Sequence, residues 1–394
     1  MKKIILFLLL FIYSGIAFGI TMNESALREI KRHPDKDNAS FIILGDSRNS
    51  DSIPEGKFGK GDSILIKIVR SINKISDKPE FVIHSGDLGI RGYKYEYYRY
   101  RSIIDSSKIP WLSIRGNHEL YSDSATYYFN EIIGDSDYVF DWNKLRFIML
   151  SNCHQKHMKG KNYSDYFISK HQLIWLDSIM KDAKNRGIIP LMFAHVPPCI
   201  DTLYTNHCLG DAKSYPKPNI EKSNVKPFKQ LLRFYNVPLA VFGHIHHYDN
   251  FMYKGTRFVI SGGAGAPMYK KFKRGDAFYH YILMEKYGSD SIKATVLNED
   301  GVEIDKKYNF TVKINTKLES VSLKYNREIK NDTLTLIFEN PLVRYISLKR
   351  FLGKAYYCDT IIKKIVKIPV KKWHYYQYKI TTGNSIQKGS FFYH

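Results

Sequence analysis

Short apolar runs that end in polar residues dominate the first third of the chain. Residues 40–44, 81–84 and 111–114 are each apolar enough for a buried strand, and each run leads into a polar turn that contains glycine. Between them, residues 62–76 carry apolar side chains at helical spacing, and the tyrosine-rich residues 93–104 are also predicted to be helical. This strand–helix–strand alternation predicts a layered α/β fold with short crossover connections.

The alternation continues to about residue 300. Residues 169–186 and 225–235 have the apolar spacing of helices. Further strands are predicted at 145–150, 188–194, 238–242, 256–261, 279–285 and 291–297. Three stretches lack a periodic pattern and are predicted to be substrate-binding loops: roughly 120–140, 152–168 and 199–224.

Potential metal ligands follow five of the predicted strands. In chain order they are Asp46, Asp87, Asn117, His195 and the pair His244 and His246. The carboxyl ends of strands are the usual site edge in open α/β sheets, and carboxylate, amide and imidazole groups all bind metals. Alternate residues of an extended segment point the same way, so His244 and His246 can converge on one site. Taken singly, each residue also has a structural interpretation, because Gly-Asp is common in turns and Asn or His can cap a helix.

The amino terminus has the pattern of a secretory signal. Lys2 and Lys3 precede an apolar run at 4–12, and Ala17 and Gly19 form a small-residue cleavage site. We therefore expect residues 1–19 to be a signal peptide and the mature protein to be periplasmic or extracellular. The alternative is a retained signal anchor, which the short apolar run makes less favourable. A short polar lead separates this segment from the first strand.

The end of the chain differs in pattern and charge. Residues 314–394 contain strand-like pieces separated by Gly and Asn turns, which predicts a small, sandwich-like all-β domain after a main domain at 20–313. The formal charge of the chain is +22, and this last segment alone contributes +10. A basic surface can bind an anionic envelope polymer, but a simple packing module with a solvated basic face is the slightly favoured alternative. The basic residues do not form a recognisable nucleic-acid module.

Four cysteines lie in the part of the chain that would be exported. Cys199 and Cys208 bracket a short segment and are the best candidates for a disulfide, which an oxidising compartment permits. An unpaired state is the alternative. The chain has no CxxC motif, which argues against a zinc ribbon or a thioredoxin-like site.

Five short motifs occur in an order that resembles the calcineurin-like metallophosphoesterase superfamily. They are Gly45-Asp46-x-Arg48, Gly86-Asp87, Gly116-Asn117-His118-Glu119, a single His195 after a strand, and Gly243-His244-x-His246. The likeness covers roughly residues 40–305 and is closest to exported branches that include the purple acid phosphatases. It implies a four-layer α/β/β/α sandwich, to which the chain adds its C-terminal all-β domain. It also implies two metal ions, divalent or trivalent (Mn, Zn or Fe), at the carboxyl ends of the strands.

The resemblance implies a role for each motif residue. Asp87 would bridge both metals, Asp46 and His246 would complete the ligands of one, and His118 would act at the leaving group and the substrate phosphate. The other metal would take the remaining three residues, Asn117, His195 and His244. Two cations that share a carboxylate can lower the pKa of a common water, which would attack phosphorus in line as hydroxide.

Two positions depart from the superfamily pattern. Arg48 stands where many members have a metal-binding His, and Ile90 stands where purple acid phosphatases have a Tyr. The metal held by Asp46 and His246 therefore lacks one ligand that is usual in the superfamily. Three alternatives follow: water fills the position, Asn49 fills it, or this metal binds weakly. Arg48 could fork onto substrate phosphate oxygens or pair with a nearby carboxylate.

The sequence thus predicts an exported dinuclear phosphoesterase that acts on a phosphorylated small molecule or another phosphate ester. Hydrolysis of phosphomonoesters is the first hypothesis and hydrolysis of phosphodiesters the second. A binding protein that kept the fold but lost catalysis is the third. The complete set of predicted ligands argues against that third hypothesis.

Overall fold

The computed structural model describes most of the chain. The described ranges are 20–49, 59–158, 160–198, 207–209, 224–270 and 274–314, and seven strands between residues 325 and 393. The predicted signal peptide at 1–19 lies outside them, so the structure does not test it. Of the described helices, none has the length and apolar character that would be needed to cross a membrane.

Two six-stranded sheets form the centre of the main domain. The order in the first sheet is β14 (Phe310–Lys313), β13 (Ser291–Leu297), β12 (Tyr281–Tyr287), β1 (Asn38–Leu44), β2 (Val82–His84) and β3 (Trp111–Ser113). The order in the second sheet is β10 (Tyr248–Tyr253), β11 (Thr256–Ser261), β9 (Leu239–Phe242), β8 (Ile189–Ala194), β5 (Leu145–Leu150) and β4 (Tyr138–Trp142). Strands β1, β2 and β3 run parallel, as do β5, β8, β9 and β11. Parallel pairing places the residues that follow these strands at one edge of each sheet.

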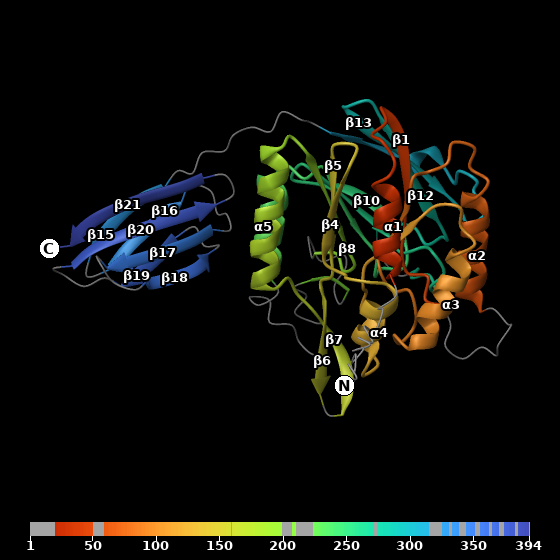
Figure 1. Cartoon of the computed structure of the whole chain (residues 1–394), viewed down its shortest axis with the longest axis horizontal. Coiled ribbons are helices and arrows are strands. Elements are labelled where there is room, and N and C mark those ends of the chain that lie inside the picture. The colour runs from red at the N-terminus through yellow and green to blue at the C-terminus, as the bar shows by residue number, and fades with distance from the viewer. Residues whose placement is uncertain are drawn as a thin grey trace, which may run out of the picture.

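Alternating side chains build four layers. Phe41 and Ile43 of β1 face the second sheet, where the ring of Phe41 meets Phe147 of β5 edge to face at 5.1 Å between centroids. Ile42 and Leu44 face the opposite way and pack against α2 (Lys60–Ile72) and α3 (Lys94–Ile104). The outer face of the second sheet packs against α5 (Lys170–Asn185) and α6 (Val225–Phe234). Figure 1 shows α5 on one side of the sheets and α2 and α3 on the other, which confirms the predicted α/β/β/α sandwich.

A helix that the sequence analysis missed covers the edge of the first sheet. The polar lead contains α1 (Met22–Ile30), whose Thr21 and Glu24 form a reciprocal capping box. Asn23 of this helix donates from Nδ2 to the carbonyl of Ser113 and accepts from the N–H of Ser113, at 2.9 Å each. These two bonds pair the backbone N–H and carbonyl groups of Ser113 on the edge strand β3, and they fix α1 against the sheet.

The prediction of a loop is wrong for two of the three stretches, because the structure has a helix or strands there. Residues 120–140 contain α4 (Ala125–Ile132), after the short 3-10 helix η1 (His118–Leu120). Residues 152–168 form a hairpin of β6 (Cys153–Met158) and β7 (Lys161–Tyr166). The strands of this hairpin carry few apolar residues, so hydrophobic periodicity gave no signal for it. Most of the third predicted loop, 199–224, lies outside the described residues.

All of the described residues beyond 325 lie in strands. One sheet has the order β15 (Tyr325–Lys330), β16 (Thr333–Phe338), β19 (Ile365–Pro369). The other has the order β18 (Ala355–Ile361), β17 (Arg344–Arg350), β20 (His374–Thr382), β21 (Ser385–Tyr393). Figure 1 shows these strands, in blue, grouped together. The strand content agrees with the all-β prediction, whereas the domain boundary at residue 314 stays a prediction.

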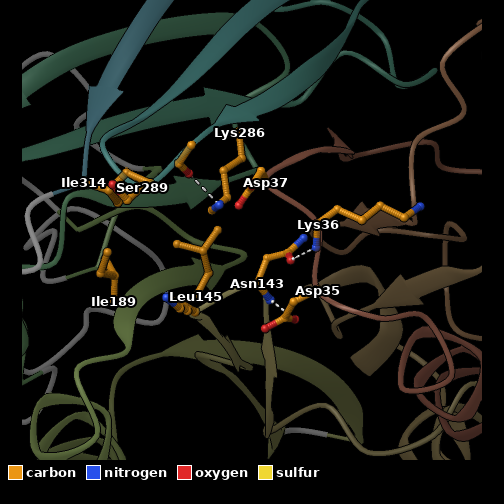
Figure 2. A pocket seen from close by; sticks show the side chains of 11 residues that line it. Asp35, Lys36, Asp37, Asn143, Leu145, Ile189, Lys286, Ser289 and Ile314 are labelled. Atoms are coloured by element: carbon orange, nitrogen blue, oxygen red, sulfur yellow. Dashed lines mark hydrogen bonds between the residues drawn. The ribbon is translucent and has the colours of Figure 1, made fainter.

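A pocket of about 270 Å³ lies at the amino ends of the parallel strands (Figure 2). Asp35 and Asp37 precede β1, Asn143 and Lys144 precede β5, and Lys286 lies near the end of the antiparallel β12. None of the predicted ligands lines this pocket, because they follow the opposite, carboxyl ends of the strands.

Candidate metal centre

The loops after β1 and β2 run side by side and turn sharply. The N–H of Asp46 donates to the carbonyl of Gly86 and the N–H of Arg48 to the carbonyl of Asp87, both at 3.0 Å. Asp46 and Asp87 have left-handed backbones with φ of 62° and 60°, and His244 follows with 66°. Such conformations are unusual for residues other than glycine and concentrate at functional sites. Both carboxylates reach residues that follow strands of the second sheet: Asp46 Oδ2 accepts from the N–H of His244 at 2.9 Å, and Asp87 Oδ1 lies 3.1 Å from His195 Nε2.

Four predicted ligands meet in what we call the first cluster: Asp87, Asn117, His195 and His244. Ligand atoms of Asp87, His195 and His244 all lie within 4.8 Å of one another. Nε2 of His195 is 3.1 Å from both Asp87 Oδ1 and Asn117 Oδ1, and Nδ1 of His244 is 2.7 Å from Asn117 Oδ1. Two imidazoles, a carboxylate and an amide oxygen thus converge, a donor set that suits a divalent cation.

Contacts behind the first cluster orient its side chains. His195 donates from Nδ1 to the carbonyl of Ser85 at 2.8 Å, which leaves Nε2 facing the cluster. Asn117 donates from Nδ2 to the hydroxyl of Tyr121 at 2.8 Å, which turns its Oδ1 inward. Partners of this kind fix the tautomer and the orientation of metal ligands.

The second cluster consists of Asp46, Asp87 and His246. Its three ligand atoms also lie within 4.8 Å of one another, and Asp87 belongs to both clusters. His246 donates from Nδ1 to the carbonyl of Pro267 at 2.7 Å, so its Nε2 carries a lone pair. This Nε2 is buried, lies 3.6 Å from Asp46 Oδ1 and has no hydrogen-bond partner among the described residues. A buried, bare imidazole nitrogen beside a carboxylate fits a metal ligand better than a structural histidine.

Glycine is required where the backbone passes close to these carboxylates. A Cβ on Gly243 would lie 2.5 Å from Asp46 Oδ2, and a Cβ on Gly116 would collide with Asp87 Oδ1. The close spacing of the backbone and these carboxylates therefore depends on two positions without a side chain. The residues that are present fit a metal centre.

The charge states of the cage also suit cations. Burial lowers the pKa of His246 to about 3 and that of His244 well below its usual value. Burial raises the pKa of Asp46 to about 7. Burial alone would raise the pKa of Asp87, but the charge and hydrogen bond of His195, together with His118 and Arg48, outweigh burial and hold the pKa well below its usual range. Burial would likewise lower the pKa of His195, but Asp87 raises it to about 9. Asp87 and His195 then form an ion pair beside the neutral imidazoles of His244 and His246, and a cation would take the place of the His195 proton.

Arg48 and His118 border the shared carboxylate. The guanidinium of Arg48 donates to Asp87 Oδ2 from Nε at 3.3 Å and from Nη2 at 3.2 Å. His118 donates from its backbone N–H to Asp87 Oδ1 at 3.0 Å and from Nδ1 to the carbonyl of Ile90 at 2.6 Å. Nε2 of His118 is 3.9 Å from Asp87 Oδ2. All eight predicted site residues therefore lie together.

Glu119 has a role that the sequence analysis did not assign. Its carboxylate accepts from the backbone N–H groups of Asp87 (3.0 Å), Leu88 (2.7 Å), Gly89 (3.1 Å) and Gly116 (2.8 Å). It is fully buried and ties the loop after β2 to the loop after β3. Its place directly after Asn117-His118 was the only sequence signal for it.

His207 is a second residue that the sequence analysis left without a role. Its ring centroid lies 6.1 Å from that of His244 and 5.5 Å from that of Tyr269. The next residue, Cys208, is disulfide-bonded, and Leu209 donates to the carbonyl of Pro197 at 2.8 Å. Cys199, the predicted partner of Cys208, lies outside the described residues. The segment 207–209 is thereby held beside the first cluster.

Comparison with known proteins agrees with this geometry. Residues 39–248, more than half of the chain, match the calcineurin-like phosphoesterase family. The chain belongs to the calcineurin-like phosphoesterase family. The matched range contains every residue of the two clusters together with Arg48 and His118.

Two individual proteins are similar to part of this chain. A probable glycerophosphodiester phosphodiesterase, GpdQ, of Arcobacter nitrofigilis is 27% identical over 138 residues, which are 34% of this chain and 48% of that protein. The structure of purple acid phosphatase PPD1 from yellow lupin (Lupinus luteus) seeds aligns with a TM-score of 0.53 and 16% identity, covering 71% of this chain and 54% of that one. This chain therefore spans about half the length of each relative. At 16% identity, the similarity to the lupin structure shows a shared fold and nothing about function.

Proposed function

We propose that this calcineurin-like phosphoesterase is an exported, metal-dependent hydrolase whose preferred substrates are phosphomonoesters. The observation that carries the proposal is that Asp87 belongs to both buried clusters of potential metal ligands. A carboxylate shared between two such clusters is the arrangement that brings two cations together for phosphate chemistry.

The two clusters divide the metal-binding work. The first cluster would hold one cation through three side-chain types, and the second would hold another through two carboxylates and one imidazole. When bound, the two cations supply positive charge for the phosphoryl group and lower the pKa of a water nucleophile. Mn, Zn and Fe are all compatible with this mixed oxygen and nitrogen donor set.

Arg48 and His118 would handle the substrate. The guanidinium of Arg48 is a planar donor that suits phosphate oxygens, and its permanent charge favours the dianion of a monoester over the monoanion of a diester. Burial lowers the pKa of His118 to about 4, so its ring is neutral in the free protein at pH 7. An anionic phosphate beside the ring favours its protonated form, from which Nε2 can donate a proton to the departing alkoxide.

Phosphodiester hydrolysis is the second candidate. It is supported by the similarity to a probable glycerophosphodiester phosphodiesterase, which covers about half of that relative. A binding protein of this fold without catalysis is the third.

Turnover of p-nitrophenyl phosphate and of bis-p-nitrophenyl phosphate separates these candidates. Each is measured with the chelated protein after adding back Mn²⁺ or Zn²⁺, with Asp87→Asn as the inactive control. A higher kcat/KM for the monoester supports the first proposal, and a higher value for the diester replaces it by the second. If metal binds but neither substrate is hydrolysed with any divalent metal, the third candidate, a non-catalytic binding protein, is the one that remains.

Export and the basic C-terminal segment are parts of the proposal that need their own tests. Amino-terminal sequencing of protein from the culture medium or periplasm should begin after Gly19 if residues 1–19 are a cleaved signal.

The net charge of +10 on residues 314–394 supports binding to an anionic envelope polymer. Retention of the full chain on an acidic polysaccharide should then fall as salt is raised, and equal retention on a neutral polysaccharide would contradict it.

A further inference from the structure

The two oxygens of the shared carboxylate have different neighbours. Oδ1 of Asp87 lies 3.1 Å from Nε2 of His195 and therefore faces the first cluster. Oδ2 is the oxygen that Arg48 holds through Nε and Nη2. The second cluster can use Asp87 only on the side where a guanidinium already sits, because Oδ1 is committed to the first cluster.

The clusters also differ in the number of their donors. The first cluster has four, since Asn117 Oδ1 lies 2.7 Å from His244 Nδ1 and 3.1 Å from His195 Nε2. The second cluster has three donors, Asp46, Asp87 and His246. Arg48 stands in the sequence where many members of the family have a metal-binding His. Arg48 is charged at any working pH, so it repels a cation there as well as competing for Asp87.

We propose that the first cluster binds its metal ion tightly and the second cluster binds its ion weakly, and that Arg48 causes the difference. This inference rests on the proposed metal-dependent function and concerns how that centre fills. Changes in the groups around metal ligands typically alter affinity by about 10–100-fold, and we expect a difference of that size between the clusters. A preparation purified without added metal should then retain about one ion per chain rather than two.

Metal titration of the whole protein tests this directly. The chelated wild type is titrated with Mn²⁺ and with Zn²⁺ by calorimetry, and bound metal is counted by mass spectrometry after gel filtration. Wild type is expected to show one tight and one weaker site. His246→Ala should abolish only the weaker site, whereas Asn117→Ala should weaken the tighter one.

Arg48 variants separate charge from shape. Arg48→Gln removes the charge and should bring the two affinities closer, and Arg48→His, which adds a potential ligand, should do so more strongly. Arg48→Lys keeps a charge and should preserve most of the difference. Arg99→Gln is the matched control, because Arg99 also pairs with a fully buried carboxylate, that of Asp62, and has the same 17% side-chain exposure as Arg48. It should leave both affinities unchanged.

The outcomes distinguish this inference from the proposed function. Two equal sites in wild type, or an unchanged difference in both folded Arg48→Gln and Arg48→His proteins, would overturn the role of Arg48 and leave the phosphoesterase proposal intact. Absence of any metal binding would overturn the metal-dependent function itself. Circular dichroism of every variant shows whether it is folded before its affinities are compared.

Discussion

Replacing Glu119 by glutamine is expected to destabilise the protein severely, although the side chain touches neither substrate nor the ligand atoms. Oε1 of Glu119 accepts from the N–H groups of Leu88 and Gly89, and Oε2 accepts from those of Asp87 and Gly116. Glutamine has nearly the same shape, but one of the two oxygens becomes an NH₂ group. That group would face two buried backbone N–H donors and could accept from neither.

The size of the effect follows from these contacts. A buried donor left without an acceptor costs about 1–3 kcal/mol, so two of them cost about 2–6 kcal/mol. Burial raises the pKa of Glu119 to about 7, so at pH values above 7 the two bonds that remain would be weaker as well, because an amide oxygen lacks the charge of a carboxylate. The loop that carries Asp87 would loosen, and metal affinity should fall together with stability.

Urea unfolding followed by circular dichroism measures the loss. Chelator is present throughout, so that reduced metal binding does not add to the difference. Glu29→Gln, the same chemical change at an exposed position of α1, is the control and should unfold like wild type. A Glu119→Gln protein with the wild-type midpoint and slope would refute the account of how the two loops are joined.

Three further substitutions probe the same structure. His118→Asn should lower kcat while metal content stays near that of wild type, and loss of metal in that variant would show that His118 is a ligand instead. Gly243→Ala should reduce bound metal, since its Cβ would come within 2.5 Å of Asp46 Oδ2, and normal metal content would contradict that crowding. Burial would raise the pKa of Glu80, but its hydrogen bond from Lys36 and that from His33 outweigh burial and lower it. Glu80→Gln should therefore reduce stability at pH 7, and the difference from wild type should shrink as the pH falls below 4.5 towards the folded-state pKa. A difference that grew on acidification would reverse that assignment.

The positions of the candidate ligands could be inferred from the sequence because each has a local cause. A short apolar run followed by Gly-Asp indicates both a buried strand and the turn that ends it, and neighbouring parallel strands bring such turns to one edge. Asp46 and Asp87 could therefore be placed without knowing the sheet order. The pair His244 and His246 needed only the alternation of an extended segment.

The missed features depend on partners far away in the chain or on weak local patterns. Glu119 acts through backbone N–H groups that lie about 30 residues earlier, and no property of residue 119 itself reveals them. The hairpin of β6 and β7 is polar on both strands, so periodicity could not find it. The helix α1 is the exception, because Thr21 and Glu24 form a capping box that is visible in the sequence.

Arg48 shows why two interpretations that compete in a sequence can both hold in a structure. Pairing with a carboxylate and binding of substrate phosphate were alternatives only as long as the carboxylate was unknown. The partner is Asp87, the residue shared by both clusters, so the ion pair holds the guanidinium beside both clusters, where the proposed function requires a phosphate to bind. Nε and Nη2 donate to Asp87, which leaves the other N–H groups of the guanidinium without a hydrogen-bond partner among the described residues. A phosphate oxygen can use those donors without displacing Arg48 from Asp87. The two proposals for Arg48, that it binds substrate and that it weakens the second cluster, are therefore compatible, and its substitution tests both.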